Sequence, residues 1–311
     1  MNRPAPDWNL YRSFLAALRE KSLSGAARAL ALTQPTLARH INALEAALGF
    51  ELFTRSQHGL TPTQAALELK PYVESLEANS AALLRTASGL GETVRGAVRI
   101  TASETVGAEI LPPILTGLRR EHPALDFELV LSDAVDNLLR RDADIAVRMV
   151  EPKQEALVVK KLGSIGLGFH AHRDYLAQFG TPTRFADLAQ HSLIGVDGET
   201  PALRSVAAHL PEVEQVRFAL RADSTIAQFR AIQAGFGIGI CQTGLAAADP
   251  QLVRLLADSF DVQLGVWLAM HENLRATLRC RAAFDGLAHG LTDYIRRHEG
   301  QALPQTASGA I

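Results

Sequence analysis

The sequence of residues 33–49 is TQPTLARHINALEAALG, and this stretch decides the fold of the N-terminal part of the chain. Thr33 is a residue type that caps helices, and Pro35 falls in the first turn, where its missing N–H costs little. Apolar residues recur at spacings of four, three and four, which predicts one buried face, formed by Leu37, Ile41, Leu44 and Leu48. Gly49 then ends the helix.

The opposite face of this predicted helix is polar near its N-terminus. Its side chains can hydrogen-bond to base edges or to phosphates, and the N-terminal half of a recognition helix is the part that enters the major groove. Any one of these residues is equally compatible with a solvated surface, His40 in particular. Their ordered combination predicts DNA binding. The polar residues of this face are Gln34, Thr36, Arg39 and His40.

Two helices are expected before this one and a wing after it. Asp7 is a suitable cap for a helix from Trp8 to about Glu20, and Ser22 or Ser24 begins a second helix that ends near Leu30. Residues 51–55, a polar tip and residues 60–62 predict two short strands joined by a turn, in which Arg55 can meet a phosphate backbone. The residues expected to contact DNA are Ser24, Thr33, Gln34, Pro35, Thr36, Arg39, His40 and Arg55.

The segment SLSGAARALALTQPTLARHINALEAALGFELFTR, residues 22–55, followed by LTPT, resembles the DNA-binding domain of LysR-type transcriptional regulators. The match is dense over about Leu10–Thr63 and implies a winged helix-turn-helix domain in residues 1–65. Ala38, His40 and Asn42 differ from the residues that family members often carry, so no operator sequence is transferred to this chain.

A long helix is predicted from Thr63 to about Leu90, and residues 66–92 are expected to form the linker and dimerisation helix between the domains. Its apolar stripe has a heptad-like spacing and consists of Ala66, Leu69, Val73, Leu76, Ser80, Leu83, Ala87 and Leu90. Either a second copy of the chain or the chain's own C-terminal domain can cover such a stripe. We expect Pro71 to kink or interrupt the helix. The resemblance implies dimerisation through this helix, a homodimer or homotetramer, and a promoter site that is an interrupted inverted repeat.

Strands and helices alternate from residue 93 onward, which is typical of a parallel α/β sheet. Glycines 89, 91 and 96 mark a hinge before it. The predicted strands are Ala97–Ala102, Leu125–Leu131, Asp144–Arg148, Ile165–His170, Leu193–Val196, Val216–Leu220, Gly237–Cys241 and Val262–Met270. The predicted helices are Glu109–Arg120, Val135–Arg141, Ile226–Ala234 and Ala276–Arg297.

The element order and the resemblance together imply an effector-binding domain of two α/β subdomains, similar to type 2 periplasmic binding proteins. The first subdomain covers about 93–163 and 265–298, and the second covers about 164–264, with a cleft between them. The tail, 299–311, is expected to be disordered. The predicted fold class is therefore α/β with an N-terminal all-α winged helix-turn-helix.

Ligands of α/β sheets bind beyond the carboxyl ends of the strands. Helix N-termini in the same place favour anions, and Arg148 is a fixed cation that can clamp a carboxylate. This reasoning predicts a small anionic effector, such as an organic acid or an amino acid. Serines and threonines at helix starts are more often simple caps. The expected effector contacts are Ser103, Glu104, Thr105, Ser132, Arg148, Asp197, Gly198 and Thr225.

The charge distribution agrees with a nucleic-acid partner at one end only. The 311 residues carry a net charge of −2, but residues 1–65 hold seven basic and four acidic residues, a balance of +3, and the remainder holds 24 and 29, a balance of −5.

The N-terminus lacks an apolar export signal, no apolar stretch suits a membrane span, and two cysteines make no disulfide framework. We therefore expect a cytoplasmic protein of two or three domains.

Several weaker signals allow other interpretations. Residues 235–239, GFGIG, follow a helix and enter a strand, the reverse of the order in a phosphate loop. His170 and His172 can share a strand face, but no third metal ligand is evident, and Cys241 and Cys280 are more typical of buried small residues than of a redox switch. The rival class is a solute-binding or enzymatic α/β protein. Because no set of catalytic residues is evident, we expect no enzyme activity, cofactor or metal. The resemblance also allows RNA polymerase as a further partner.

Overall fold

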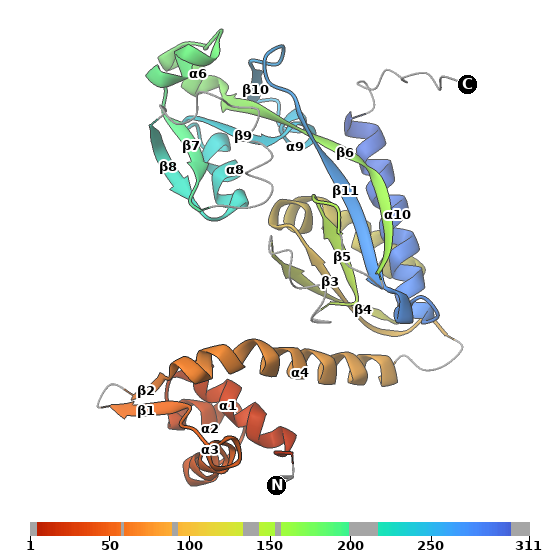
Figure 1. Ribbon diagram of the computed structural model, residues 1–311. Coiled ribbons are helices and arrows are strands. Elements are labelled where there is room, and N and C mark those ends of the chain that lie inside the picture. Colours follow the sequence, from red (N-terminus) through yellow and green to blue (C-terminus); the bar gives the residue numbers. More distant parts are fainter. Residues whose placement is uncertain are drawn as a thin grey trace, which may run out of the picture. The chain divides into compact units, whose positions relative to one another are not determined.

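The computed structural model describes residues 5–56, 59–88, 93–132, 143–152, 157–198 and 217–299 (Figure 1). The chain forms two compact units, which divide between Leu84 and Arg85. No helix in the described ranges is both long and apolar enough to cross a membrane. The predicted helix Val135–Arg141, the hinge residues Gly89 and Gly91, and the tail from residue 300 lie outside the described residues.

The first unit contains three helices, a two-stranded wing and most of a long helix. Asp7 caps the first helix by accepting a hydrogen bond from the Asn9 amide at 2.7 Å, and Ser22, not Ser24, caps the second by accepting from the Gly25 amide at 3.0 Å. The elements are α1 (Trp8–Glu20), α2 (Leu23–Ala29), α3 (Gln34–Leu48), β1 (Phe53–Ser56), β2 (Gly59–Pro62) and α4 (Gln64–Ser88).

The core of the first unit is the junction of α1, α2 and α3. Phe14, Leu37 and Leu44 are fully buried there, and Phe14 also contacts the Phe53 ring of the wing at a centroid distance of 5.8 Å. The small side chain of Ala26 is fully buried as well, because α2 approaches its neighbours closely. The stripe predicted for α3 therefore faces the inside of this unit.

Helix α4 is continuous through Pro71, so the helix is not interrupted there, and a kink at this residue stays a prediction. The carbonyl that loses its hydrogen bond belongs to Leu67, which lies on the exposed side of the helix, where water can satisfy it. The apolar stripe is divided between two environments. Ala66 and Val73 are buried in the core of the first unit, whereas Leu76 and Leu83 are 48% and 67% exposed, so part of the stripe already has a partner within its own chain.

Among the described residues, the second unit consists of one nine-stranded sheet and the helices around it. Its strands are β3 (Gly96–Ala102), β4 (Leu125–Leu131), β5 (Ile145–Arg148), β6 (Leu157–His172), β7 (Leu193–Val196), β8 (Phe218–Ala222), β9 (Ile238–Gln242), β10 (Leu252–Leu255) and β11 (Val262–His271). Its helices are η1 (Val106–Ile110), α5 (Leu111–Glu121), α6 (Arg173–Phe179), η3 (Phe185–Gln190), α8 (Thr225–Gln233), α9 (Thr243–Ala247), η5 (Glu272–Leu274) and α10 (Leu278–Glu299).

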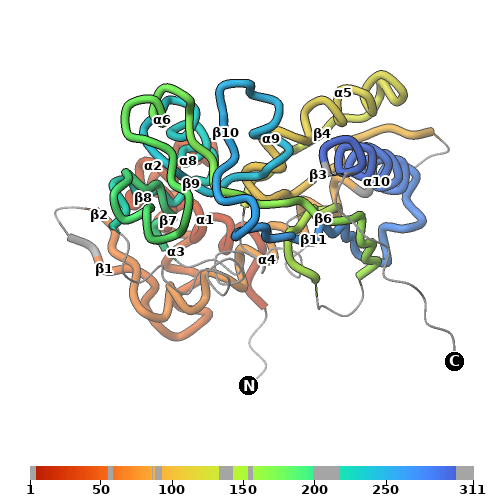
Figure 2. The backbone as a smooth tube through the Cα atoms, turned by 90° about the horizontal axis from the view of Figure 1, so that it is seen from above, coloured from red at the N-terminus to blue at the C-terminus, as the bar shows by residue number. Residues whose placement is uncertain are grey.

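The sheet is mixed, which corrects the prediction of a parallel sheet. The strand order is β4-β3-β5-β11-β6-β9-β7-β8, with β10 paired to β6. The pairs at the two ends of this order are parallel, but β6 and β11 are antiparallel to each other and to their outer neighbours. Figure 2 shows β6 and β11 side by side, because the chain leaves along one and returns along the other.

These two strands join two halves of the second unit. The first half contains β3, β4, β5, η1, α5 and α10, and the second half contains β7, β8, β9, β10, α6, α8 and α9 (Figure 1). Strand β6 is much longer than the predicted Ile165–His170 because it runs through both halves. The pairing shifts register between Val266 and Trp267, opposite Gly163, whose φ of +147° and closeness to Ile295 disfavour any larger residue.

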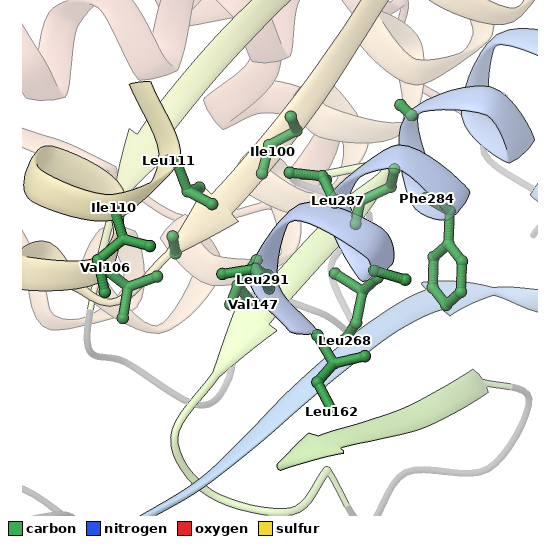
Figure 3. Close-up of a cluster of buried hydrophobic side chains, with 14 of the residues drawn as sticks. Ile100, Val106, Ile110, Leu111, Val147, Leu162, Leu268, Phe284, Leu287 and Leu291 are labelled. Carbon is green, nitrogen blue, oxygen red and sulfur yellow. The ribbon is translucent and has the colours of Figure 1, made fainter. Parts of the chain in front are cut away.

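The main core of the second unit lies between α10 and the sheet. Figure 3 shows Leu287 and Leu291 of α10 close to Ile100, Val147 and Leu268 of the strands. All five side chains are fully buried. The helix predicted at Ala276–Arg297 is observed as α10, which extends to Glu299, so residue 299 belongs to a helix and not to the tail.

A buried charged cluster lies at the start of β5. Asp144, which is 2% exposed, accepts hydrogen bonds from Arg85 Nε at 3.2 Å and from the Arg99 amide at 2.9 Å. The nearly inaccessible Arg279 of α10 donates its Nε to the Ala97 carbonyl at 3.0 Å. Because Arg85 also belongs to the second unit, this cluster lies within that unit.

Candidate nucleic-acid interface and effector site

Helix α3 begins and ends where its sequence predicts. Thr33 accepts a hydrogen bond from the Thr36 amide at 3.4 Å, and the two hydroxyl groups lie 2.8 Å apart. Gly49 adopts a left-handed conformation with φ of +89° and donates its amide to the Glu45 carbonyl. The helix therefore presents a defined first turn.

The polar face of α3 is accessible at its N-terminal end. Gln34, Pro35 and Arg39 are exposed, and Thr36 and His40 are half-buried. These side chains remain on the surface while the apolar stripe packs inward. This is the arrangement that a helix needs before it can enter a groove.

Two hydrogen bonds fix parts of this face. His40 Nδ1 lies 2.8 Å from the hydroxyl of Ser13, which is fully buried in α1, and Ser24 donates its hydroxyl to Gln34 Oε1 at 3.3 Å. Sequence reasoning missed Ser13, because nothing in the spacing of α1 indicates which residue of α3 faces it. The Ser13 contact orients the His40 ring, and Ser24 orients the amide of Gln34.

The backbone amides of the wing attach it to the helices, two of them through the side-chain carboxylate of Glu45. Glu45 of α3 accepts the amides of Leu52 at 2.7 Å and Phe53 at 3.3 Å, and the Leu60 amide donates to the Lys21 carbonyl at 2.9 Å. Gly59 packs so closely against that carbonyl that a Cβ would lie 2.6 Å from the oxygen. The wing is thus held at both strands.

Arg55 lies on β1, paired with Leu60 on β2, and only its backbone is described. The tip residues 57 and 58 lie outside the described residues. The structure therefore places Arg55 on the wing strand that the sequence predicts, and its contact with DNA stays a prediction.

In the second unit, Glu104 links the end of β3 to the start of α8. Its carboxylate accepts the Ser224 hydroxyl at 2.8 Å, the Thr225 hydroxyl at 3.0 Å and the Ile226 amide at 3.3 Å. Burial raises the pKa of Glu104, but these hydrogen bonds outweigh burial and leave the pKa below its ordinary value. Thr105 also donates to Thr225, at 2.8 Å.

Arg148 is oriented toward its neighbouring strand. The residue is 5% exposed, and its two Nη atoms donate to the Val147 carbonyl and to the Thr101 hydroxyl, each at 3.0 Å. Sequence reasoning missed Thr101 because it selected only residues beyond the strand ends. The guanidinium that was predicted to clamp a carboxylate is thus already hydrogen-bonded within the sheet.

The remaining predicted effector residues lie at strand ends but are less closely connected. Ser132 donates its amide to the Ala102 carbonyl at 2.9 Å, which places it beside Ser103. Asp197 and Gly198 are exposed after β7, and the Asp197 amide donates to the Ala222 carbonyl at 2.9 Å. Glu104, Thr105 and Thr225 therefore form one cluster, and Asp197 and Gly198 are outside it.

Sequence reasoning missed Ile226 of the Glu104 cluster, because this residue takes part through its backbone amide and not through its side chain. Ser224 caps α8 by accepting the Ala227 amide at 3.1 Å, so its position at the helix start was the available signal. A further cross-link joins Glu109 of η1 to Arg230 of α8 at 2.7 Å. Neither ion-pair partner carries a signal in the sequence, because they are far apart along the chain.

The two histidines of β6 have separate partners. His170 Nδ1 lies 2.9 Å from the Gly168 carbonyl and 3.3 Å from Cys241 Sγ, whereas His172 Nδ1 accepts the Asp174 amide at 3.2 Å. Burial lowers the pKa of His170 to about 4 and raises the pKa of Cys241 to about 12. At neutral pH the buried imidazole is therefore neutral and the thiol beside it is protonated.

Burial also raises the pKa of Cys280 to about 12, and the negative charge of Asp144 adds to this. Both cysteines are free, and the described residues contain no group of three or more metal-ligating side chains. The GFGIG segment forms the turn from α8 into β9, with φ of +75° at Gly235. It thus connects a helix to a strand, as the sequence predicted.

Comparison with known proteins identifies two matching family models. Residues 91–291 match the LysR substrate binding domain, and residues 8–67 match the bacterial regulatory helix-turn-helix protein of the lysR family. The chain is 24% identical to the transcriptional regulator PgrR of Escherichia coli K12 over 185 residues, which cover 59% of this chain and 62% of PgrR. The match therefore spans about three fifths of that relative.

Two further similarities cover more of the chain. The transcriptional regulator PtxR of Pseudomonas aeruginosa is 26% identical over 284 residues, which are 90% of this chain and 91% of PtxR. The crystal structure of full-length CbnR in complex with its target DNA has a TM-score of 0.64 and 19% identity, and the alignment covers 94% of this chain and 99% of that chain. This likeness shows that the fold is shared.

Proposed function

Because the chain belongs to the LysR family of transcriptional regulators, we propose that it binds promoter DNA through α3 and the β1–β2 wing, under the control of a small effector. The observation that carries this proposal is the exposed polar start of α3, with Arg39 and Gln34 at the surface while Leu37, Ile41 and Leu44 on the other face are buried. The relatives named above are transcriptional regulators, which are not enzymes. A bacterial regulator of this kind acts in the cytoplasm, where the chromosome lies.

Replacing Arg39 by alanine is expected to weaken binding to promoter fragments by about tenfold to a hundredfold, because one charged contact to a base or phosphate is lost. The measurement is fluorescence anisotropy with labelled duplex at several salt concentrations, and the dependence on salt should become less steep. Arg55→Ala tests the wing in the same way.

The matched control is Lys70→Ala, which removes one positive charge from the exposed side of α4. It is expected to leave promoter affinity within about twofold of the native chain, as befits a surface charge outside the interface. If the Arg39 variant and the native protein bind promoter DNA with equal affinity and are equally stable to heat, the proposal that α3 contacts DNA is contradicted.

We propose that the protein acts as a homodimer or homotetramer on an interrupted inverted repeat. The exposed part of the α4 stripe supports this, since Leu76 and Leu83 are seven residues apart and both accessible. Recruitment of RNA polymerase by the assembled regulator is part of the same proposal.

The double substitution Leu76→Glu with Leu83→Glu is expected to shift the protein from dimer to monomer in sedimentation velocity at micromolar concentration, because it buries like charges against each other. Glu68→Lys, which changes an exposed position of α4 outside the stripe, serves as the control and should leave the mass unchanged. A double variant that still sediments as a dimer would show that another surface holds the copies together.

We propose that the effector is a small anion, such as a carboxylate, bound where the strand ends of the two halves meet. Supporting this, β3 and α8 bring Ser103, Thr105 and Thr225 to one region, and α8 directs its first amides there. A thermal-shift screen of small organic and amino acids is the test. A flat response of the folded protein across the whole screen would contradict the sensing role.

A further inference from the structure

The contact of Glu104 with α8 joins parts of the second unit that are distant along the chain. Glu104 follows β3 in the first half, and Ser224, Thr225 and Ile226 begin α8 in the second half, about 120 residues away. The strands that connect the halves, β6 and β11, do not take part in this contact. It is therefore a separate link between the halves.

The carboxylate fits this position chemically. Oε1 accepts one hydroxyl, and Oε2 accepts a second hydroxyl and a backbone amide of α8. A negative charge at a helix N-terminus is favourable because the first amides have no partner within the helix. Hydrogen bonds to a charged acceptor are also stronger than neutral ones. Glu104 thus supplies the anion that the start of α8 needs.

Two neighbouring interactions connect the same pair of elements. Thr105 donates to Thr225 at 2.8 Å, and Glu109 pairs with Arg230 at 2.7 Å. All residues on one side lie within 104–109, which overlaps the π-helix η1, and all residues on the other side lie within 224–230 of α8 and its cap. A π-helical turn is rare and is often found where function requires an altered geometry.

We propose that Glu104 is an intramolecular latch, which holds the two halves of the second unit together until an effector releases it. This inference rests on the proposed function and concerns the regulation of the same site. The latch occupies the α8 amides with the protein's own carboxylate, so an anionic effector has to displace Glu104 before it can use them. The sensor then switches between a latched and a released state, and the effector shifts their populations.

The test is hydrogen exchange of the full-length protein, followed at the peptides that contain residues 225–228. In Glu104→Ala, these amides are expected to exchange about tenfold faster than in the native chain, because a charge-assisted hydrogen bond is lost. Glu104→Gln keeps the shape without the charge and should show a smaller acceleration in the same peptides. Glu121→Gln, on an exposed residue at the end of α5, is the control and should not change them.

Propionate, which reproduces the Glu104 side chain, provides a second measurement. It should slow exchange at residues 225–228 in Glu104→Ala, whereas propionamide and chloride at equal ionic strength should not. Two results would overturn the latch. One is an exchange rate at residues 225–228 that is the same in Glu104→Ala and in the native chain. The other is an equal slowing of that exchange by propionate in both proteins. If Glu104→Ala does not fold, Thr225→Val, which removes a donor to Glu104, is compared with the native chain: faster exchange at residues 225–228 is expected, and equal exchange would contradict the latch.

Promoter binding by the same proteins separates this inference from the proposed function. If the protein shows the expected exchange pattern but does not prefer promoter DNA, the latch is supported and the proposed DNA-binding function is contradicted. If the protein binds its promoter but its amides at residues 225–228 exchange equally fast with and without Glu104, the DNA-binding function is supported and the latch is contradicted.

Discussion

Replacing Asp144 by alanine is expected to destabilise the second unit by about 3–5 kcal/mol, the cost of breaking a buried ion pair. The carboxylate is 2% exposed and accepts from Arg85, which is itself 8% exposed. Arg279, at 1% exposure, lies in the same region, and its two Nη atoms have no hydrogen-bond partner among the described residues. Without Asp144, buried positive charge loses the carboxylate that offsets it.

Urea unfolding followed by circular dichroism measures this loss. Asp126→Ala is the matched control, because Asp126 pairs with Arg119 at 3.0 Å on the surface, with 74% of its side chain exposed, and should cost less than about 1 kcal/mol. The pair Arg85→Met with Asp144→Leu should be more stable than Asp144→Ala alone, since it removes both charges together. A loss below about 1 kcal/mol in Asp144→Ala would show that the cluster is not coupled to folding.

The second large effect is a loss of stability in mild acid caused by His170. The residue is 2% exposed, and burial, aided by the charge of Arg254, lowers its pKa from 6.5 to about 4. Between these values the unfolded chain binds a proton that the native chain excludes, so stability falls as the pH decreases. The shift corresponds to about 3 kcal/mol, present above pH 6.5 and lost by pH 4.

The free energy of unfolding at half-unit steps from pH 7.5 to pH 4 tests this expectation. In His170→Gln the slope over this range should decrease by the contribution of one proton. His289→Gln, with 81% of the side chain exposed on α10, should keep the native slope. An identical slope in native protein and His170→Gln would mean that the imidazole accepts its proton inside the fold.

Local sequence patterns correctly predicted the short elements that have the same surroundings along their whole length. Strands Leu125–Leu131 and Leu193–Val196 are observed with the predicted bounds, because both are short segments that lie between clear turns. Strand β6 was predicted too short, since Lys160 and Lys161 break the apolar pattern where the strand runs through the first half. The four-residue strand β10 was missed for a similar reason, because Arg254 interrupts its apolar run.

The direction of the central strands could not be predicted locally. A parallel and an antiparallel arrangement of β6 and β11 bury the same side chains, and only the pairing across both halves distinguishes them. The stripe of α4 gave a similar ambiguity, because its spacing is regular while its partners change from the core of the first unit to solvent. Periodicity identifies a buried face but not what covers it.

The candidate site was predicted in part. The rule of strand ends selected Glu104, Thr105 and Thr225, which the structure brings together. It gave Glu104 the role of an effector contact, but the carboxylate is bound by α8. The sequence could not reveal this because the donors come from a helix in the other half. The DNA-contacting residues and the domain boundaries stay predictions.

The attachment of the wing to α3 has a consequence for how a signal reaches the promoter. Glu45 holds the amides of Leu52 and Phe53, and Lys21 holds that of Leu60, so the helix and the wing turn as one body. Such a body cannot adjust its own span to a duplex. In the proposed dimer, each such body contacts its half-site as a unit, so we expect an effector to change which spacer length between the half-sites is preferred.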